Sequence, residues 1–147
     1  MALIGDNEQQ TSLPEYSNWG ARWDKRARGL GATIAIPTTS AGDDNMRCAT
    51  PDRYWNQDIL VHEFAHGVHL VAAQYVIPGF ALKVRAAYEA AMAAGLWEGT
   101  YAATNYREYW VSQAVNALSE LLHPIVYCCI LYAVSFIMYP CAILIVE

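Results

Sequence analysis

The sequence has little positive charge. Nine Lys and Arg residues stand against 14 Asp and Glu residues, which gives the 147-residue chain a net charge of −5. Nucleic-acid binding depends on clustered basic side chains that neutralise phosphates, and the short cluster RWDKRAR at residues 22–28 is interpreted as a solvated face. We therefore expect no nucleic-acid partner. Internal repeats are also absent, and a chain of this length holds one domain, which excludes repeat arrays and multidomain proteins.

Charged residues are missing from a long segment just before the final residue, Glu147. Residues 121–146 contain no Asp, Glu, Lys or Arg. A helix over residues 125–146 would be about 33 Å long, so a membrane span is one interpretation. Against it, Pro140 would interrupt the helix, no basic residue flanks the segment, and its β-branched and aromatic residues suit strands equally well. We divide the chain into a domain at residues 1–120 and an apolar tail at residues 121–147.

Signals for a cellular compartment are weak. The N-terminus has no basic segment followed by a long apolar core, so no signal peptide is predicted. Of the four cysteines, Cys48 lies in the polar part and the others in the tail, and this distribution does not fix the compartment. Localisation stays open between a secreted and a membrane-associated protein.

The hydrophobic patterns predict mixed α and β structure. Short strands are expected at the apolar start of the chain and at the alternating, β-branched segment ATIAIP, residues 32–37, with a loop over residues 38–52. The first helix has Asp58 as its N-cap and stops before Pro78. The last has Thr104 or Asn105 available as a cap. The three predicted helices cover residues 58–76, 80–97 and 103–122.

The first predicted helix contains the segment HEFAH. His62 and His66 are four residues apart, which places both imidazoles on one face of a helix at the spacing that holds a metal ion. Glu63 is rotated off that line, so it can act as a general base on a metal-bound water, whose pKa zinc lowers to about 7. The apolar residues around the motif favour a buried helix. The alternative is two core histidines with other partners.

A catalytic zinc ion takes three protein ligands, and the third is not obvious. His69 would lie roughly 10 Å along the helix axis from His62, so a packing role is favoured for it. The downstream glycine and histidine of the metzincin pattern are absent from GVHLVAA, residues 67–73. A carboxylate from a later helix is left. The candidates are Glu89, which suits an exposed helix face, and Glu98, Glu108 and Glu120.

The segment TYAATNYREYW, residues 100–110, resembles the second motif of the metallopeptidases related to the anthrax lethal factor catalytic domain. In that family a tyrosine precedes the zinc-ligating glutamate by seven residues, as Tyr101 precedes Glu108 here. The resemblance implies a zinc-dependent metalloendopeptidase of gluzincin type. Its Zn²⁺ ligands would be His62, His66 and Glu108, with Glu63 as the general base and Tyr101 stabilising the oxyanion.

The chain is also similar, over about residues 1–110, to a less-studied branch of zincin-like proteins. The branch carries acidic residues and an asparagine before the HExxH helix, matched here by Asp43, Asp44 and Asn45. For these three residues we favour a capped, solvated turn over substrate contact.

The resemblance implies an α+β, zincin-like fold. A small, mostly antiparallel N-terminal sheet would pack on the HExxH helix, with the Glu108 helix opposite. A peptide or protein substrate would lie along the edge of the sheet as an added strand.

The resemblance ends after Trp110, where family members continue with Ala-Glu and this chain reads Val111-Ser112. Val-Ser can be encoded by GTAAGT, a splice-donor sequence. One hypothesis is therefore that residues 111–147 are translated intron and that the domain is incomplete. Two classes of function follow: an active zinc metalloendopeptidase, or a catalytically inactive product that binds metal or is anchored to a membrane by its tail.

Overall fold

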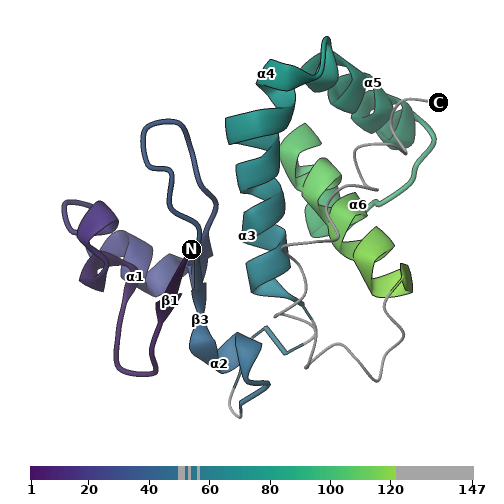
Figure 1. The fold of residues 1–147 in the computed structure, drawn as a ribbon. Coiled ribbons are helices and arrows are strands. Elements are labelled where there is room, and N and C mark those ends of the chain that lie inside the picture. Colours follow the sequence, from purple (N-terminus) through teal and green to yellow (C-terminus); the bar gives the residue numbers. More distant parts are fainter. Residues whose placement is uncertain (50–51, 53, 56, 122–147) are drawn as a thin grey trace.

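The computed structural model describes residues 1–49, 52, 54–55 and 57–121, and it shows the predicted α+β architecture. The tail, including the membrane span considered for residues 125–146, lies outside the described residues. A long helix, α3, stands between a small N-terminal sheet on one side and helices α5 and α6 on the other (Figure 1). This central helix carries the HExxH motif, so both halves of the molecule meet at the candidate site.

The N-terminal sheet has three short strands in the order β1-β3-β2. β1 pairs with β3 in parallel, whereas β2 pairs with β3 in antiparallel orientation. The expectation of a mostly antiparallel sheet is therefore wrong for one of the two strand pairs. A long connection separates β1 from β3, which permits a parallel pairing that a hairpin would forbid. The strands are β1 (Ala2–Ile4), β2 (Gly29–Leu30) and β3 (Ser40–Gly42).

The strand expected at residues 32–37 is not formed. The segment closes on itself, because Thr33 N donates to Ile36 O over 2.8 Å and Ile36 N donates to Thr33 Oγ1 over 3.1 Å. Ile34 is 60% exposed, so the alternating pattern does not bury one face of a strand. The loop expected over residues 38–52 is likewise wrong in part, because it contains β3 and the short helix α2 (Asp43–Met46).

Short helical turns cover the outer side of the sheet. They are η1 (Gln10–Ser12), η2 (Pro14–Tyr16) and α1 (Arg22–Arg26). Tyr16 contacts Trp19 edge to face, and Trp19 contacts Trp23 with tilted rings, at centroid distances of 5.0 and 4.9 Å. Tyr16 is almost fully buried. This aromatic ladder packs the turns together without a long helix.

The central helix confirms the prediction over residues 58–76. It runs as α3 (Ile59–Gly67), a π-helical segment η3 (Val68–Ala73) and α4 (Gln74–Val76). Asp58 caps its start, since Val61 N donates to Asp58 Oδ1 over 2.9 Å. The chain then turns at Pro78 and at Gly79, whose φ of 71° is a conformation that glycine adopts at little cost.

The two remaining long helices pack on one side of α3. α5 (Phe80–Ala93) ends before the predicted residue 97, and α6 (Tyr106–Leu121) begins after a short turn, η4 (Tyr101–Thr104). α6 is continuous through Trp110 and Val111, the point where the family resemblance ends, and both side chains are buried. The core between α3, η3, α5 and α6 consists of Ala65, Ala73, Phe80, Val84, Trp110, Val111 and Ala114.

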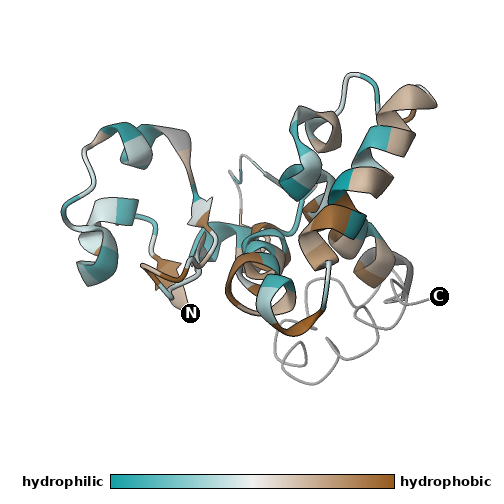
Figure 2. Ribbon diagram, turned by 90° about the horizontal axis from the view of Figure 1, so that it is seen from above, coloured by the Kyte–Doolittle hydropathy of each residue, from teal (hydrophilic) through white to brown (hydrophobic). Residues whose placement is uncertain are grey.

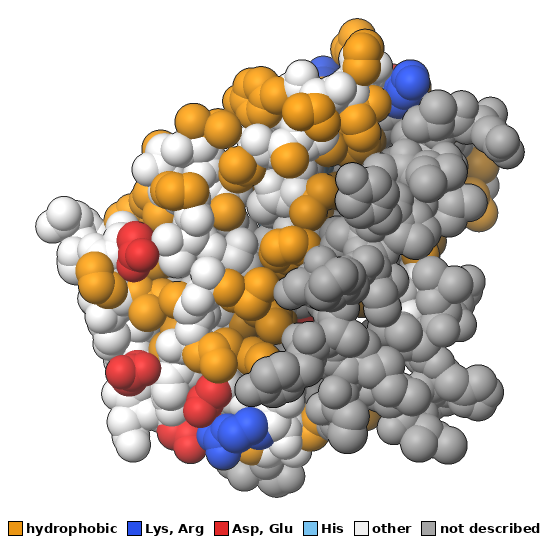
Figure 3. Space-filling model, viewed as in Figure 1, with side chains coloured by type: hydrophobic (Ala, Val, Ile, Leu, Met, Phe, Trp, Pro, Cys, Tyr) orange, Lys and Arg blue, Asp and Glu red, His pale blue; other side chains and the backbone are white. Residues whose placement is uncertain are grey.

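Apolar residues gather around α3 and the helices beside it, whereas the turns beyond the sheet are largely hydrophilic (Figure 2). Some apolar side chains also reach the surface at the corner between α4 and α5, where Tyr75, Val76 and Leu82 are each more than 60% exposed. Orange side chains are visible along the upper edge of the molecule (Figure 3). Among the described helices, none has the length and apolar composition that crossing a membrane requires.

Candidate metal centre

Two of the candidate ligands come from one face of α3. His62 and His66 lie one helical turn apart, with ring centroids separated by 5.0 Å, as the four-residue spacing predicts. Their side chains are 16% and 13% exposed, so the rings are largely enclosed but reachable. The cap at Asp58 begins the helix only four residues before His62, which fixes where this face starts.

The third candidate ligand comes from the first turn of α6. Asn105 caps this helix, because its Oδ1 accepts from Arg107 N over 2.9 Å and from Glu108 N over 3.2 Å. Of the two caps considered for this helix, Asn105 is the one the structure uses. Its amide oxygen therefore holds the backbone of Glu108 directly and sets the direction in which that carboxylate leaves the helix.

These three side chains converge on one point. Glu108 Oε2 lies 3.3 Å from His62 Nε2 and 3.2 Å from His66 Nε2, and the ligand atoms of the group all lie within 4.8 Å of one another. In a tetrahedral zinc site with bonds of about 2.1 Å, ligand atoms are about 3.4 Å apart. The donor set and its separations therefore fit a metal ion, with two imidazoles, one carboxylate and an open position.

The electrostatics of the group favour a charged Glu108. Burial raises the pKa of its carboxyl, but hydrogen bonds from His62 and His66 and their positive charge outweigh burial and bring the pKa down to about 2. Glu108 is therefore ionised across the physiological range. A divalent cation would bind this carboxylate together with the neutral forms of the two imidazoles.

Glu63 has the opposite tendency. Burial raises the pKa of its carboxyl, and the neighbouring His62 and His66 only partly offset that effect. A carboxyl group with a raised pKa beside a metal site is suited to taking up a proton and giving it back. The two carboxyl groups of the site thus differ, because the pKa of Glu108 is lowered and that of Glu63 is raised.

Two glycines of the sheet side bring the backbone close to Glu63 and His66. A Cβ atom on Gly29 would lie 2.7 Å from Glu63 Cγ, and one on Gly31 would lie 2.4 Å from His66 Cβ. A backbone hydrogen bond from Gly31 to Glu63 also acts on that carboxyl. Only residues without side chains leave room for the motif at this interface.

Tyr101 lies next to the metal group, at the start of η4. Its ring centroid is 6.1 Å from that of His62, and its side chain is 58% exposed. Tyr101, Glu63 and the three candidate ligands line one cavity of about 550 Å³, with Trp23, Leu30 and Tyr54 among its apolar walls. All five residues singled out for catalysis or metal binding thus share one space.

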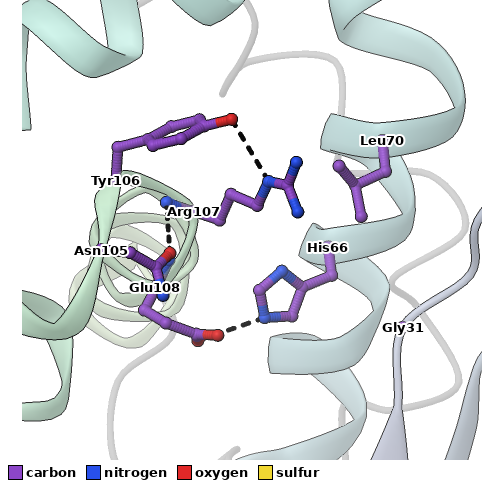
Figure 4. Close-up of a pocket in the computed structure, with 7 residues that line it drawn as sticks. All are labelled: Gly31, His66, Leu70, Asn105, Tyr106, Arg107 and Glu108. Atoms are coloured by element: carbon purple, nitrogen blue, oxygen red, sulfur yellow. Dashed lines mark hydrogen bonds and ion pairs between the residues drawn. The ribbon is translucent and has the colours of Figure 1, made fainter.

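A second cavity, of about 400 Å³, lies beyond His66 and Glu108. Its wall also includes Gly31, Leu70 and the start of α6, as Figure 4 shows. Arg107 extends across this cavity from α6 towards α3. The candidate metal group therefore lies between two cavities, and His66 and Glu108 line both of them.

His69 is not part of the metal group, as expected. It is 1% exposed and is surrounded by the rings of Phe80, Tyr106 and Trp110, at centroid distances of 5.3, 6.0 and 6.3 Å. Neither ring nitrogen has a hydrogen-bond partner among the described residues. Burial, followed by the positive charges of Arg107 and His66, lowers the pKa of His69 to about 4, so the ring is neutral and packs as an aromatic side chain.

The segment with Asp43, Asp44 and Asn45 is not the solvated turn that we expected. It forms α2, where Asp44 pairs with Arg28 and Asp43 lies 3.2 Å from Arg47. Asn45 joins α2 to the start of α3, since its Oδ1 accepts from the backbone N of Ile59 over 2.9 Å, and its Nδ2 donates to the loop before α3. These side chains hold the entry to the HExxH helix.

Two contacts of the site were not predicted from the sequence: the approach of Gly29 and Gly31 to the motif, and the hydrogen bond of Asn45 with the start of α3. Gly29 and Gly31 are two residues apart, which puts them on the same side of an extended segment, and that spacing could have suggested a close backbone contact. Asn45 carried no comparable signal, because its partners are 7 to 14 residues away. Of the other carboxylates considered as ligands, Glu89 and Glu98 are exposed and lie outside the metal group.

Comparison of the chain with protein-family models, with curated proteins and with solved structures gives no match.

Proposed function

We propose that this protein is a zinc-dependent endopeptidase of the zincin type, similar in its site to the metallopeptidases related to the anthrax lethal factor catalytic domain. One observation carries the proposal: His62, His66 and Glu108, from two helices, meet with their ligand atoms within 4.8 Å of one another. Two imidazoles and one carboxylate with an open position form the donor set of catalytic zinc, which suits this set better than other divalent metals do.

In the proposed mechanism a residue of this chain takes each part of the chemistry. Bound Zn²⁺ would lower the pKa of its water molecule to about 7 and would act as a Lewis acid on the peptide carbonyl. Glu63 takes the proton of the attacking water and returns it to the leaving amine, and its raised pKa favours that exchange. Tyr101 donates its hydroxyl proton as a hydrogen bond to the oxyanion that forms at the carbonyl.

The position of the sheet edge is consistent with a peptide substrate. β2 is an outer strand, paired on one side only with β3. Gly29 and Leu30 line the larger cavity and Gly31 lines the smaller one, so this edge runs past the metal group from one hollow to the other. A peptide added along the edge as an extended strand would present its backbone to the metal centre.

Elemental mass spectrometry on the purified full-length chain tests the metal centre. We expect one zinc per chain, and at least about a tenfold weaker retention in Glu108→Ala, because a ligand and its negative charge are lost. Glu89→Ala removes an exposed glutamate outside the group and serves as the control. Equal zinc retention in both variants would contradict Glu108 as a ligand.

Cleavage of a mixed peptide library, followed by mass spectrometry, tests the activity. Glu63→Gln keeps the shape of the side chain but removes the base, so cleavage should fall by about 10²- to 10⁴-fold while zinc stays bound. Glu89→Gln is the matched control. A zinc-loaded chain that cleaves no peptide would instead identify the inactive metal-binding product, and equal cleavage by Glu63→Gln and wild type would exclude the mechanism.

A further inference from the structure

Two arginines flank one tyrosine at the start of α6. The guanidinium carbon of Arg85 lies 4.9 Å from the centroid of the Tyr106 ring, and that of Arg107 lies 5.6 Å from the same centroid. Arg107 Nε also donates to Tyr106 Oη over 3.3 Å. The ring therefore holds two positive groups near each other, although like charges repel.

Neither arginine has a carboxylate partner within the described residues. The arginine ion pairs among the described residues join Arg28 and Arg47 to aspartates, and none of them involves Arg85 or Arg107. Two guanidinium groups beside one ring, neither of them in an ion pair among the described residues, give this part of the surface a positive potential, although the Glu108 carboxylate lines the same cavity as Arg107. An anion bound there would relieve the repulsion between them.

The position of Arg107 connects this charge to the metal group. Arg107 lines the 400 Å³ cavity together with His66 and Glu108, and its guanidinium reaches across the cavity towards Leu70 on the central helix (Figure 4). The hydrogen bond from Nε to Tyr106 fixes the orientation of the guanidinium and leaves the terminal NH₂ groups for a ligand. A planar guanidinium of this kind matches a carboxylate, which accepts two parallel hydrogen bonds.

We infer that Arg107, with the positive charge of Arg85 beside the same Tyr106 ring, binds a carboxylate of the substrate on the Gly31 side of the metal group. The inference rests on the proposed endopeptidase function and narrows its substrate class to peptides with a negative charge close to the scissile bond. The carboxylate has two sources, an Asp or Glu side chain or the C-terminus of the peptide. Arg107 acts here as a specificity-determining residue and takes no part in proton transfer.

The test compares matched peptides on the full-length, zinc-loaded chain. A peptide cleaved in the library is synthesised with Glu, Gln or Lys at each position beside the scissile bond, and both of its ends are blocked. The Gln peptide is also synthesised with a free C-terminal carboxylate next to the cleaved residue. Two readouts are taken: kcat and KM for cleavage, and binding to the Glu63→Gln chain by titration calorimetry. If the library shows no cleavage, blocked Ala-Glu-Ala, Ala-Gln-Ala and Ala-Lys-Ala peptides are titrated instead.

We expect the Glu peptide to bind about tenfold more tightly than its Gln counterpart, the scale of one charge-assisted hydrogen bond, with the difference in KM rather than in kcat. Arg107→Gln should reduce this ratio to near one, and Arg107→Lys should restore part of it. Lys83→Gln removes an exposed positive charge of α5 that lines neither cavity, so it should keep the ratio.

The outcomes separate the inference from the function on which it rests. Cleavage with equal use of Glu and Gln peptides, or a preference that survives in Arg107→Gln, overturns the carboxylate site and leaves the endopeptidase standing. Tighter binding of the acidic peptide without any cleavage upholds the anion site and rejects the peptidase. A preference for the free C-terminus over the Glu side chain identifies the terminal carboxylate as the ligand.

Discussion

On the sheet side of α3 the backbone of two glycines packs against the residues of the motif, whereas on the α6 side the packing is between aromatic rings. Gly29 and Gly31 bring a strand so close that no Cβ atom would fit against Glu63 and His66. Trp110, Phe80 and His69 fill the opposite side with rings 5.1 to 6.3 Å apart. The glycine contact limits the movement of Glu63 and the histidines. The aromatic packing sets the distance between α3 and α6, and so the distance of Glu108 from the histidines.

The difference shows that the site is positioned by two kinds of packing, a close glycine contact on one side and aromatic rings on the other. An atom added at the glycine contact forces the sheet segment or α3 to shift, and such a shift strains the hydrogen bonds of that segment. Aromatic packing tolerates small changes of shape but loses much stability when a whole ring is removed. Variants on the two sides should therefore fail in different ways.

Removal of the largest ring should have the largest effect. Trp110→Ala leaves a cavity between α3 and α6, and we expect the free energy of unfolding to fall by about 4 kcal/mol. Urea denaturation of the zinc-free chain measures the loss. Trp55 is 82% exposed, so Trp55→Ala is the control, with an expected change of less than about 0.5 kcal/mol. A small effect of Trp110→Ala would show that aromatic packing does not hold α6 in place.

Low pH should have the second-largest effect, a loss of unfolding free energy through His69 on the aromatic side of α3. His69 has a pKa of about 4 in the folded chain, and a free histidine has one of about 6.5, so the unfolded chain binds more protons between these values. Stability from the neutral ring is complete above pH 6.5 and falls as the pH drops to 4, by about 3 kcal/mol.

Denaturation curves from pH 7 to pH 4, with a chelator present, measure this slope. His69→Leu removes the titrating group and keeps an apolar side chain among the surrounding aromatic rings. The unfolding free energy of this variant should therefore lose about 3 kcal/mol less than that of the wild type between pH 7 and pH 4. The same slope in both chains would mean that His69 does not report on the packing.

The sheet side is tested by one methyl group. In Gly31→Ala the new Cβ would lie 2.4 Å from His66 Cβ and 3.0 Å from the backbone oxygen of Glu63, so the strand must move. We expect a loss of about 2 kcal/mol in unfolding free energy, together with weaker zinc retention. Gly20→Ala has no atom within 4 Å of its added methyl and should change neither quantity. Equal behaviour of the two variants would contradict the close approach.

The helix caps provide the smallest and most selective comparison. Asp58→Ala and Asn105→Ala should each lower the unfolding free energy by about 1 kcal/mol. Only Asn105 accepts a hydrogen bond from the backbone of Glu108, so only its loss should weaken zinc binding beyond the effect on stability. Asp58→Asn retains the cap and should be nearly neutral. Zinc titrations at equal folded fraction separate the two effects.

Local patterns carried most of the successful prediction. The helix over residues 58–76, its cap at Asp58 and the pairing of His62 with His66 all depend on residues within one or two helical turns. The strand expected at residues 32–37 failed because an alternating pattern buries one face only when a second strand lies beside it. A parallel partner such as β1, about 38 residues from β3, leaves no mark of its own in the sequence.

The choice of the third ligand shows the same limit. Spacing within the chain left four glutamates as candidates, and only the family resemblance singled out Glu108. In the structure Glu108 meets the histidines because α6 crosses α3 at the aromatic core, through contacts between residues more than 40 positions apart in the chain. The tail and the origin of residues 111–147 stay predictions, although Val111 and Ala114 pack within the core.

By itself, then, the sequence determined the approximate positions of the helices, the cap at Asp58 and the two histidines with Glu63 between them, because hydrogen bonds and side-chain spacing within a helix are set by near neighbours. Only the tertiary structure decided that Glu108 completes the group, that Gly29 and Gly31 press the sheet edge against Glu63, and that Arg107 faces the cavity beside the metal centre. These contacts join distant segments, and such segments meet only when apolar burial outweighs the entropy lost in closing the chain between them.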